Sequence, residues 1–324
     1  MAKLQSFLGA ALVSVAALVL AACGSGTSSE GTGKVSFFMT DAPVDEAYAV
    51  VIAMTHFEVK PAEGRAFRLD IEHDEDKSYR QINLLEYTKG KLATIVTDEE
   101  LDAGEYEWLR IFFDADPDHS YIQIDEGGGM YPFFMPSGAQ TGYKVIGGFS
   151  VRADEQIDYV LDFNVRESVL EPPGLVSRFG EDRAFLLKPT VRLMKIAATG
   201  AVTGTIHDSL LTMNNEEVTC AGGYAVYAFE GFDVNPVGES VLPFISDIVE
   251  MNDEGDFEYA FMFLPPGPYT LAFTCSANLD TAEGEDYAST YPPEGLKFSA
   301  KIEVEIDARE TKECDIPLNG EGPC

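Results

Sequence analysis

The chain has 324 residues, with 22 Lys or Arg against 55 Asp or Glu, which gives a formal net charge of -33 at pH 7. Since 45% of the residues are hydrophobic, the chain can build packed cores, and a disordered acidic polymer is excluded. The charge also argues against a nucleic-acid partner, because a phosphate backbone needs a basic face. The length is typical of about two domains.

Residues 1–22 have the pattern of a secretory leader. Lys3 gives a positive start, and the run Phe7–Ala22 is apolar or small throughout, too short to span a membrane comfortably. The segment Leu20-Ala-Ala-Cys23 resembles the lipobox of bacterial lipoproteins. This resemblance implies a lipoprotein signal peptide over residues 1–22 and acylation of Cys23, for example with palmitate. The alternative is an ordinary signal peptide with an incidental cysteine.

Residues 24–33, GSGTSSEGTG, predict a flexible tether after Cys23. Gly24 after the cysteine resembles the signal for outer-membrane sorting in Gram-negative bacteria. We therefore expect a protein that is lipid-anchored in the bacterial cell envelope, at the outer membrane, with the membrane as a partner through its acyl chains.

Runs of alternating hydrophobicity, rich in Val, Ile, Phe and Tyr, dominate the chain after the tether and predict β-strands. We expect a single helical turn over Asp98–Leu101. In the first part of the chain the expected strands lie at Lys34–Met39, Ala49–Lys60, Arg65–Ile71, Ser78–Leu84, Tyr106–Phe113, Tyr121–Asp125, Tyr143–Val151, Ile157–Asp162 and Ala184–Lys195.

Small residues at Ala197–Gly200 suggest a domain boundary. Many short strands at regular spacing on both sides of it predict an all-β protein of two β-sandwich domains in tandem, over residues 34–197 and 198–324. In the second domain the expected strands lie at Ala201–His207, Tyr224–Glu230, Phe257–Leu264, Tyr269–Ser276, Phe298–Ile306 and Glu313–Leu318.

One short pattern, L-x-x-G-x-Y, occurs once in each expected domain, at Leu101–Tyr106 and at Leu264–Tyr269. The Gly allows a tight turn, and the Tyr starts a strand with its ring on the core face, as at a crossing between two sheets. Trp108 follows in the same strand as Tyr106, and we expect it in the core.

Four cysteines lie beyond Cys23, all in the last third of the chain. In an exported protein they are expected to form two disulfides. Three pairings are compatible with the sequence; we favour Cys220–Cys275, between two predicted strands, with Cys314–Cys324 holding the C-terminal tail. A four-cysteine zinc site does not fit, because no C-x₂-C pair is present.

Five segments in the first half resemble the bacterial DUF4382 family, a domain of unknown function in exported lipoproteins. They are Phe38–Val44, Leu101–Arg110, Pro136–Lys144, Leu161–Ser168 and Leu186–Pro189. The resemblance implies an exported β-rich domain and brings no catalytic residues.

The second half is similar to carboxypeptidase-regulatory-like sandwiches of the prealbumin type. The similarity rests on Gly200–Ile206, Ala225–Phe229 and Leu264–Leu271. It implies a stalk or an adhesive spacer.

The segment Asp114–Asp125 is the candidate metal site. Its alternating carboxylates overlap the pattern of a calcium loop, which uses six to eight hard oxygen ligands. The expected ligands are Asp114, Asp116, Asp118, Ser120 and Asp125. Three features depart from an EF-hand: His119 occupies the Gly position, Asp125 replaces the bidentate Glu, and the flanks are strands. The alternative is a solvated hairpin loop in which Asp favours the turn.

Three further residues are candidates for a ligand-binding or a structural role: Asp41, Asp162 and Arg166. Asp41 follows the first strand and could cap a local turn, bind a cation or contact a ligand. Arg166 could pair with Asp162 or with Asp41, which would lock the domain. A substrate-binding Arg is the alternative.

These features predict a non-enzymatic binding or structural module that needs no cofactor and whose partner is an envelope protein or a glycan. No G-x-S-x-G elbow and no P-loop occurs in the sequence. Two alternatives stay open. One is a calcium-dependent adhesin or glycan-binding protein. The other is an envelope hydrolase with a carboxylate pair.

Overall fold

The structure is a computed structural model of the chain. It describes residues 31–41, 47–136, 138, 140–171, 183–212, 220, 222–235, 242–280, 296–318 and 324, without the side chains of Arg166 and Glu167. The predicted signal peptide, Cys23 and most of the tether lie outside the described residues. No helix in these ranges is long and apolar enough to cross a membrane.

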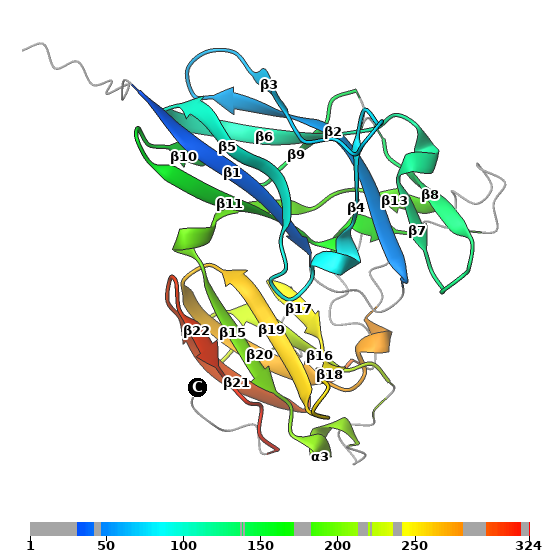
Figure 1. The fold of residues 1–324 in the computed structure, drawn as a ribbon. Helices are drawn as coiled ribbons and strands as arrows, with labels where there is room; N and C mark the ends of the chain where they lie inside the picture. The colour runs from blue at the N-terminus through cyan, green and yellow to red at the C-terminus, as the bar shows by residue number, and fades with distance from the viewer. Residues whose placement is uncertain are drawn as a thin grey trace, which may run out of the picture.

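Two β-sandwiches follow one another along the chain (Figure 1). The first contains β1 (Thr32–Asp41), β2 (Ala49–Pro61), β3 (Phe67–Asp70), β4 (Arg80–Asn83), β5 (Ala93–Asp102), β6 (Gly104–Phe113), β7 (Tyr121–Gln123), β8 (Met130–Phe134), β9 (Tyr143–Lys144), β10 (Phe149–Val151), β11 (Gln156–Phe163), β12 (Val169–Leu170), β13 (Phe185–Leu187) and β14 (Val191–Lys195). Its short helices are η1 (Leu84–Tyr87), η2 (Pro117–His119) and α1 (Val165–Ser168).

The second sandwich follows η3 (Ile196–Ala198). It contains β15 (Gly200–Thr205), α3 (Asp208–Leu211), β16 (Ala225–Glu230), β17 (Ile245–Ile248), β18 (Glu250–Met251), β19 (Phe257–Leu264), β20 (Gly267–Thr274), η4 (Ala277–Leu279), β21 (Ala300–Ile306) and β22 (Thr311–Glu313). The expected all-β architecture of two sandwiches is confirmed.

The N-terminal domain packs a four-stranded sheet, in the order β14-β11-β1-β5, against a larger sheet centred on β2 and β6. Strand β1 pairs in parallel with β11 and antiparallel with β5. Apolar side chains alternate along β1, so Val35, Phe37 and Met39 are fully buried between the sheets. The ring of Phe37 lies 5.4 Å from that of Phe149 and 6.0 Å from that of Phe57, at the centre of the core.

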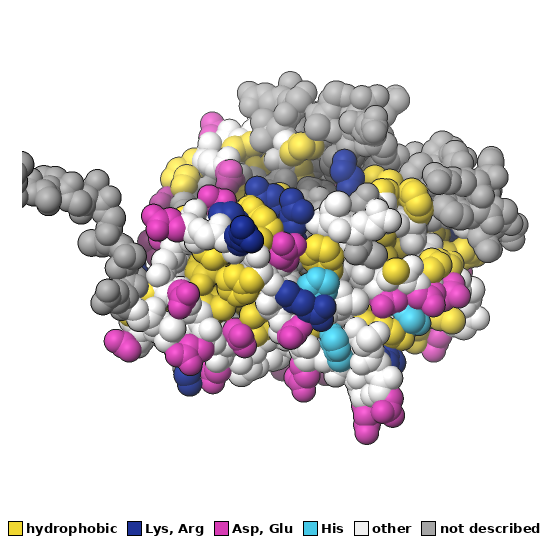
Figure 2. All heavy atoms as spheres, turned by 90° about the horizontal axis from the view of Figure 1, so that it is seen from above, with side chains coloured by type: hydrophobic (Ala, Val, Ile, Leu, Met, Phe, Trp, Pro, Cys, Tyr) yellow, Lys and Arg dark blue, Asp and Glu magenta, His cyan; other side chains and the backbone are white. Residues whose placement is uncertain are grey.

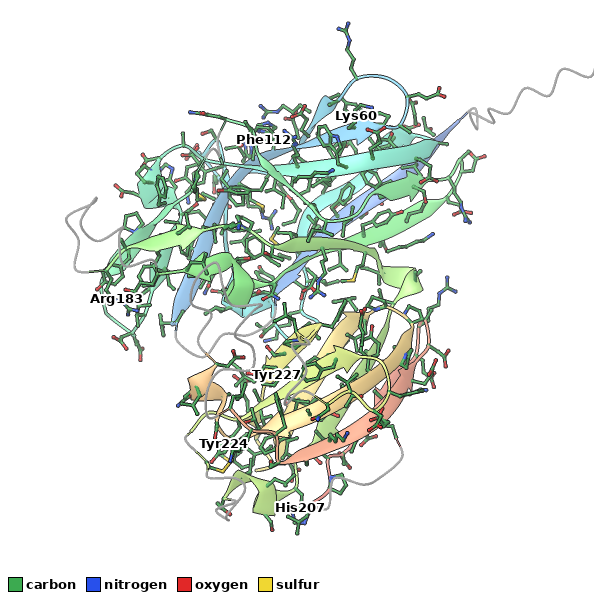
Figure 3. All side chains as sticks on the ribbon, turned by 180° about the vertical axis from the view of Figure 1, so that it is seen from behind. Lys60, Phe112, Arg183, His207, Tyr224 and Tyr227 are labelled. Atoms are coloured by element: carbon green, nitrogen blue, oxygen red, sulfur yellow. A yellow bond between two sulfur atoms is a disulfide. The ribbon has the colours of Figure 1, made fainter. Side chains whose placement is uncertain are left out.

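The C-terminal domain packs the sheet β18-β19-β15-β22 against the sheet β17-β16-β20-β21. Its core includes large aromatic side chains whose polar ends are hydrogen-bonded. The hydroxyl of Tyr227 donates to Asp280 at 2.6 Å, and that of Tyr259 donates to the carbonyl of Cys314 at 2.5 Å. Tyr227 lies inside the domain in Figure 3. These bonds offset the cost of removing the tyrosine hydroxyl groups from water.

Both L-x-x-G-x-Y segments form the same corner. The hydroxyl of Tyr106 donates to the carbonyl of Asp102 at 3.1 Å, and that of Tyr269 donates to the carbonyl of Pro265 at 2.9 Å. Both tyrosines are buried. The first corner leads from β5 to β6 and the second from β19 to β20, in each case from one sheet to the other. The predicted crossing between sheets is therefore confirmed in both domains.

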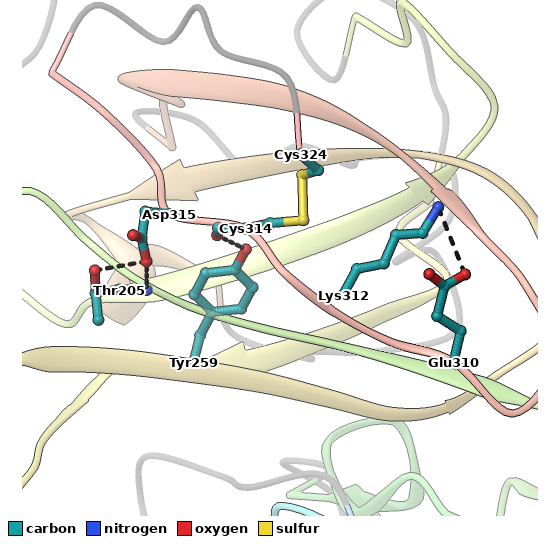
Figure 4. The surroundings of a disulfide bond; sticks show 7 residues. All are labelled: Thr205, Tyr259, Glu310, Lys312, Cys314, Asp315 and Cys324. Carbon is teal, nitrogen blue, oxygen red and sulfur yellow. Dashed lines mark hydrogen bonds and ion pairs between the residues drawn. A yellow bond between two sulfur atoms is a disulfide. The ribbon is translucent and has the colours of Figure 1, made fainter.

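Two disulfides join the expected pairs, Cys220–Cys275 and Cys314–Cys324, both in the C-terminal domain. The second is shown in Figure 4, where Tyr259 contacts the carbonyl of Cys314. Next to it, the amide and the hydroxyl of Thr205 both donate to the carboxylate of Asp315 at 2.8 Å. These bonds fix the segment after β22 against β15, and the disulfide ties that segment to Cys324.

The expected strand Glu313–Leu318 was wrong, because the strand in this region, β22, ends at Glu313. Two further sequence-based predictions were wrong because of β-bulges. Asp98–Leu101 is part of β5 and not a helical turn; Asp98 has φ 51°, and the pairing of β5 with β1 shifts register beside it. Trp108 lies on the outer face of its sheet and is half-buried. The register of β2 and β6 shifts between Lys60 and Pro61, so Tyr106 faces the core while Trp108 faces outward.

Candidate functional site

A buried ion pair lies where the two domains meet. Asp162 on β11 and Arg192 on β14 are directly opposite each other in the sheet, and the carboxylate Oδ2 lies 3.3 Å from the guanidinium Nη2. Only 8% of the Asp162 side chain is exposed. Burial raises the pKa of Asp162, and the positive charge of Arg192 counteracts that rise. The pair therefore compensates a charge that is largely shielded from bulk solvent.

Arg192 also reaches the C-terminal domain. Its Nη1 donates to the carbonyl of Phe244 at 3.1 Å, and its Cζ lies 4.1 Å from the centroid of the Phe244 ring. A guanidinium on an aromatic face gains from the cation–π interaction, most strongly where water is excluded. One side chain thus connects the carboxylate of one domain with the backbone and a ring of the other.

A second buried carboxylate, Asp247 on β17, comes from the C-terminal domain. Its Oδ2 accepts a hydrogen bond from the amide of Ala260 at 2.8 Å, and its Oδ1 has no hydrogen-bond partner within the described ranges. Burial raises the pKa of Asp247 to about 7; the Ala260 amide and Lys89 counteract the rise, and Glu250 adds to it. Lys89 belongs to the N-terminal domain and forms an ion pair with Glu250 at 2.8 Å.

The end of β1 organises the N-terminal side of this contact. Asp41 accepts a hydrogen bond from the amide of Val165 at 3.1 Å and so caps the start of α1. The hydroxyl of Thr40 donates to the carbonyls of Tyr87 at 2.9 Å and Lys91 at 3.1 Å, which holds the loop that carries Lys89. Asp41 therefore has a structural contact, and the helix it caps is 124 residues away in the sequence.

A cavity of about 20 Å³ lies between the domains, lined by Asp41, Asp162 and Asp247 together with Lys89 and residues of β19. This volume suits about one water molecule and is far smaller than an organic ligand requires. We call the contact formed by these four residues and Arg192 the interdomain junction. Its buried carboxylates are partly compensated by the nearby cations, which suits a structural contact between the domains.

A bulge in β19 helps to close the junction. Phe263 has φ 58°, a left-handed conformation that is unfavourable for an aromatic residue, and the pairing of β15 with β19 shifts register here. The bulge directs Met262 toward Gly90 of the N-terminal domain. A Cβ atom at position 90 would lie 2.9 Å from Cγ of Met262, so only glycine fits there without movement.

The predicted calcium loop has a different arrangement. Asp114 accepts bonds from the amide of Asp116 and from the His119 ring, both at 2.9 Å, and Asp116 accepts from the amide of Asp118 at 3.1 Å. Ser120 is fully buried and accepts from the amide of Ala53 at 2.9 Å in β2. These acids form successive turns around η2, and Ser120 belongs to the core.

Asp125 lies in the next turn, where its carbonyl accepts from the amide of Gly128 at 2.9 Å. Across the described ranges, no group of three or more His, Cys, Asp or Glu side chains is placed to hold a metal ion. The geometry of Asp114–Asp125 thus fits the turn-forming alternative, and we do not propose calcium binding there.

The three candidate residues beside the first strand have separate outcomes. Asp41 and Asp162 come together at the junction, as their positions on the paired strands β1 and β11 allow. The partner of Asp162 in the structure is Arg192. The side chain of Arg166 lies outside the described part, so its pairing stays a prediction. Sequence reasoning missed Arg192, Lys89 and Asp247, whose only signal was a charge within or next to an apolar strand.

The N-terminal domain matches a known protein family. Residues 32–189 match the family model described as "Domain of unknown function (DUF4382)". The N-terminal domain is a DUF4382 domain. The matched range of the DUF4382 domain includes Asp41 and Asp162 and ends just before β14, which carries Arg192. No curated protein matches the chain.

Several solved structures are similar to the chain. The Bacillus anthracis TIE protein is 11% identical, with 88% of this chain and 34% of that chain covered and a TM-score of 0.19. The chain thus spans about a third of its length. A putative cell adhesion protein of Bacteroides fragilis is 7% identical over 87% of this chain and 92% of that one, with a TM-score of 0.21.

The minor pilin of Streptococcus agalactiae is 10% identical, with 87% of this chain and 94% of the pilin covered and a TM-score of 0.18. TM-scores this low carry no argument about the fold. The two sandwiches are defined by their own strand order and pairing.

Proposed function

We propose that the chain is a lipid-anchored protein of the bacterial cell envelope with a non-enzymatic binding or structural role. The observation that carries the proposal is the course of β1. This strand begins at Thr32, where the predicted tether ends, and it finishes at Asp41 inside the interdomain junction (Figure 1). One extended strand therefore links the tethered end of the molecule to the contact with the C-terminal domain.

The pairing of β1 suits a load-bearing role. It is bonded in parallel to β11 from Lys34 to Asp41 and antiparallel to β5 on its other side. A pull along the tether would load these hydrogen bonds together. The neighbouring strand β11 carries Asp162, whose partner Arg192 holds Phe244 of the C-terminal domain. A force on the tether would thus be transmitted through β1, β11 and the Asp162–Arg192 pair to the C-terminal domain.

The anchor in this proposal is Cys23. Acylation at the Leu20-Ala-Ala-Cys23 segment would leave a short flexible tether between the membrane and β1, and Gly24 would direct the protein to the outer membrane. The partner would be an envelope protein or a glycan, held by the exposed surface of the two domains.

Incorporation of labelled palmitate tests the anchor. Cells that express the wild-type chain should give a labelled protein in the membrane fraction, and Cys23→Ala should remove both the label and the membrane association. A wild-type chain without label, or a labelled Cys23→Ala variant, would contradict the anchor.

The non-enzymatic role has its own test. The purified protein is incubated with polysaccharide and peptide libraries, and the products are separated by mass. We expect the libraries to remain intact. Release of products by the wild-type chain, lost on substitution of a single acidic residue with the fold retained, would overturn this part of the proposal.

A further inference from the structure

The outer face of the large sheet in the N-terminal domain carries a row of charged side chains across four strands. Lys144 on β9 lies opposite Arg110 on β6, Arg110 lies opposite Glu58 on β2, and Glu58 lies opposite Arg68 on β3. Adjacent strands are about 4.8 Å apart, so the row extends about 15 Å. A row of this length suits a polymer better than a single small ion.

Aromatic rings flank this row on the same face. Trp108 lies opposite Lys60, and Phe112 lies opposite His56. The guanidinium carbon of Arg110 is 4.7 Å from the Trp108 ring centroid, and the His56 and Phe112 rings stack at 4.4 Å with an interplanar angle of 15°. In Figure 3 Lys60 and Phe112 lie on the outer layer of the domain. The rings provide an apolar surface, and the charged side chains next to them provide polar contacts.

Two of the cations on this face have no acidic partner in the described structure. Lys60 pairs with Glu107 at 3.4 Å and Arg68 with Asp70 at 2.6 Å. In contrast, neither Arg110 nor Lys144 forms an ion pair with any described residue. Arg110 donates through Nη1 to the carbonyl of Thr141 at 2.9 Å, and its buried Nε finds no acceptor in the described ranges.

This arrangement is unusual for a chain with a net charge of -33. Figure 2 views the molecule from this side and shows Lys and Arg side chains, with histidines beside them, gathered over the middle of the face, while Asp and Glu lie mostly around them. In physiological salt the Debye length is about 8 Å, so a bound anion responds mainly to the charges next to it. Locally, the unpaired cations attract a carboxylate.

We propose that this outer sheet face, formed by Trp108, Arg110, Lys144, His56 and Phe112, binds an acidic polysaccharide; this inference rests on the binding role in the proposed function. Arg110 offers a fork of donors that matches a carboxylate, and Lys144 offers a second charge on the next strand. The apolar face of a sugar ring packs on the half-buried Trp108. A polymer of uronic-acid units has both a carboxylate and an apolar ring face in every unit.

The shape of the face favours a glycan over a membrane. Trp108 is half-buried and Phe112 is buried, so neither projects far enough to enter a bilayer. Burial, together with the charge of Arg68, lowers the pKa of His56, which keeps its ring neutral and stacked on Phe112. A flat, rigid platform at the surface contacts an extended sugar chain without rearrangement.

Trp108 is the only tryptophan of the chain, so its fluorescence reports on this face directly. The full protein, purified in detergent, is titrated with polygalacturonate and, in parallel, with dextran. We expect a saturable change in fluorescence with polygalacturonate, none with dextran, and weaker binding as salt increases. Arg110→Gln and Lys144→Gln should each weaken binding about tenfold through loss of a charge-assisted contact.

Arg152→Gln is the matched control, because Arg152 is an exposed arginine of the same domain that forms an ion pair with Glu155. It should bind polygalacturonate as the wild type does. Lys144→Gln removes an exposed side chain, so its melting temperature should not change and a loss of binding cannot come from unfolding.

Several results would overturn the inference. The site would be contradicted if polygalacturonate gave no saturable change in fluorescence. It would also be contradicted if Arg152→Gln lost binding as much as Arg110→Gln does. An equal response to dextran would show that the face does not recognise the negative charge of the polysaccharide. An equal response to poly-glutamate or to phosphatidylglycerol vesicles would show that a polyanion or a lipid binds in place of a sugar. Shortening of polygalacturonate during the titration would instead contradict the proposed non-enzymatic role, whether or not the site exists.

Discussion

The two domains use the same corner and different means of stabilisation. Tyr106 and Tyr269 turn the chain between sheets in the same way, yet every disulfide of the structure lies in the C-terminal domain. The N-terminal domain has the larger hydrophobic core. This difference shows how a smaller sandwich, which buries less apolar surface, gains from covalent links that its larger neighbour does not need. Unfolding measurements on variants of each domain test that contrast.

The largest effect should come from the centre of the larger core. Phe37 is fully buried and contacts the rings of Phe57, Phe149 and Tyr159. Phe37→Ala should lower the free energy of unfolding of the N-terminal domain by up to about 5 kcal/mol, from lost burial and a cavity. Denaturant unfolding measures it, with exposed Phe67→Ala as the control. An unchanged midpoint for Phe37→Ala would contradict a domain that depends on packing.

Removal of the longer disulfide should have the next largest effect. Cys220 and Cys275 are 55 residues apart, so the double change Cys220→Ala with Cys275→Ala should cost about 4 kcal/mol through the entropy of the unfolded chain. The Cys314–Cys324 disulfide closes a loop of only 10 residues, so Cys314→Ala with Cys324→Ala should cost about 3 kcal/mol. Calorimetry should show that only the C-terminal transition shifts; a shift of the N-terminal one would contradict the contrast.

The interdomain junction should separate the two transitions when it is broken. Arg192→Ala leaves the buried carboxylate of Asp162 without its partner, which should cost about 3 kcal/mol. It also removes the contact with Phe244. We expect the N-terminal transition to fall and the two transitions to move apart in calorimetry. Exposed Arg152→Ala is the control, and a single unchanged transition in Arg192→Ala would show that the junction does not couple the domains.

Asp247 should give a pH dependence. Its pKa in the folded state is raised to about 7, above the value in the unfolded chain, so the folded state holds the proton more tightly. Its contribution to stability is therefore present at low pH and is lost as the pH rises through about 7. From pH 5 to pH 8 the wild type should lose about 2 kcal/mol relative to Asp247→Asn. Parallel pH curves for the two proteins would contradict this account.

The smallest effect on stability is expected at Trp108. Because the side chain lies half-buried on the outer sheet face, Trp108→Phe should change the free energy of unfolding by less than about 1 kcal/mol. A loss as large as that of Phe37→Ala would place Trp108 in the core. Binding of polygalacturonate to this variant, measured by calorimetry, should weaken even though the stability is retained.

Much of the fold was predictable because it depends on local patterns. Alternation located most long strands but not β5, the L-x-x-G-x-Y segments located both corners, and a cysteine shortly before one predicted strand with another inside a second gave the longer disulfide. Bulges were not predictable, since one extra residue reverses the faces without any change in composition; Asp98 and Trp108 were misplaced for this reason.

The junction was predictable only in part. Asp41 and Asp162 were recognised as special, but their partners lie far away in the sequence, at Val165 and at Arg192. Which cation compensates a buried carboxylate depends on strand pairing, which the sequence alone does not fix. The spacing of acids from Asp114 to Asp125 suggested calcium, although short Asp-rich turns produce the same spacing.

The central claim is that the interdomain junction fixes the C-terminal domain relative to the tethered strand β1. Residual dipolar couplings of backbone amides in the two domains, measured on one weakly aligned sample at pH 6, test it most directly. We predict that a single alignment tensor fits both domains of the wild type and that Arg192→Ala needs two. Two different tensors for the wild-type protein would contradict the claim, because the domains would then reorient independently.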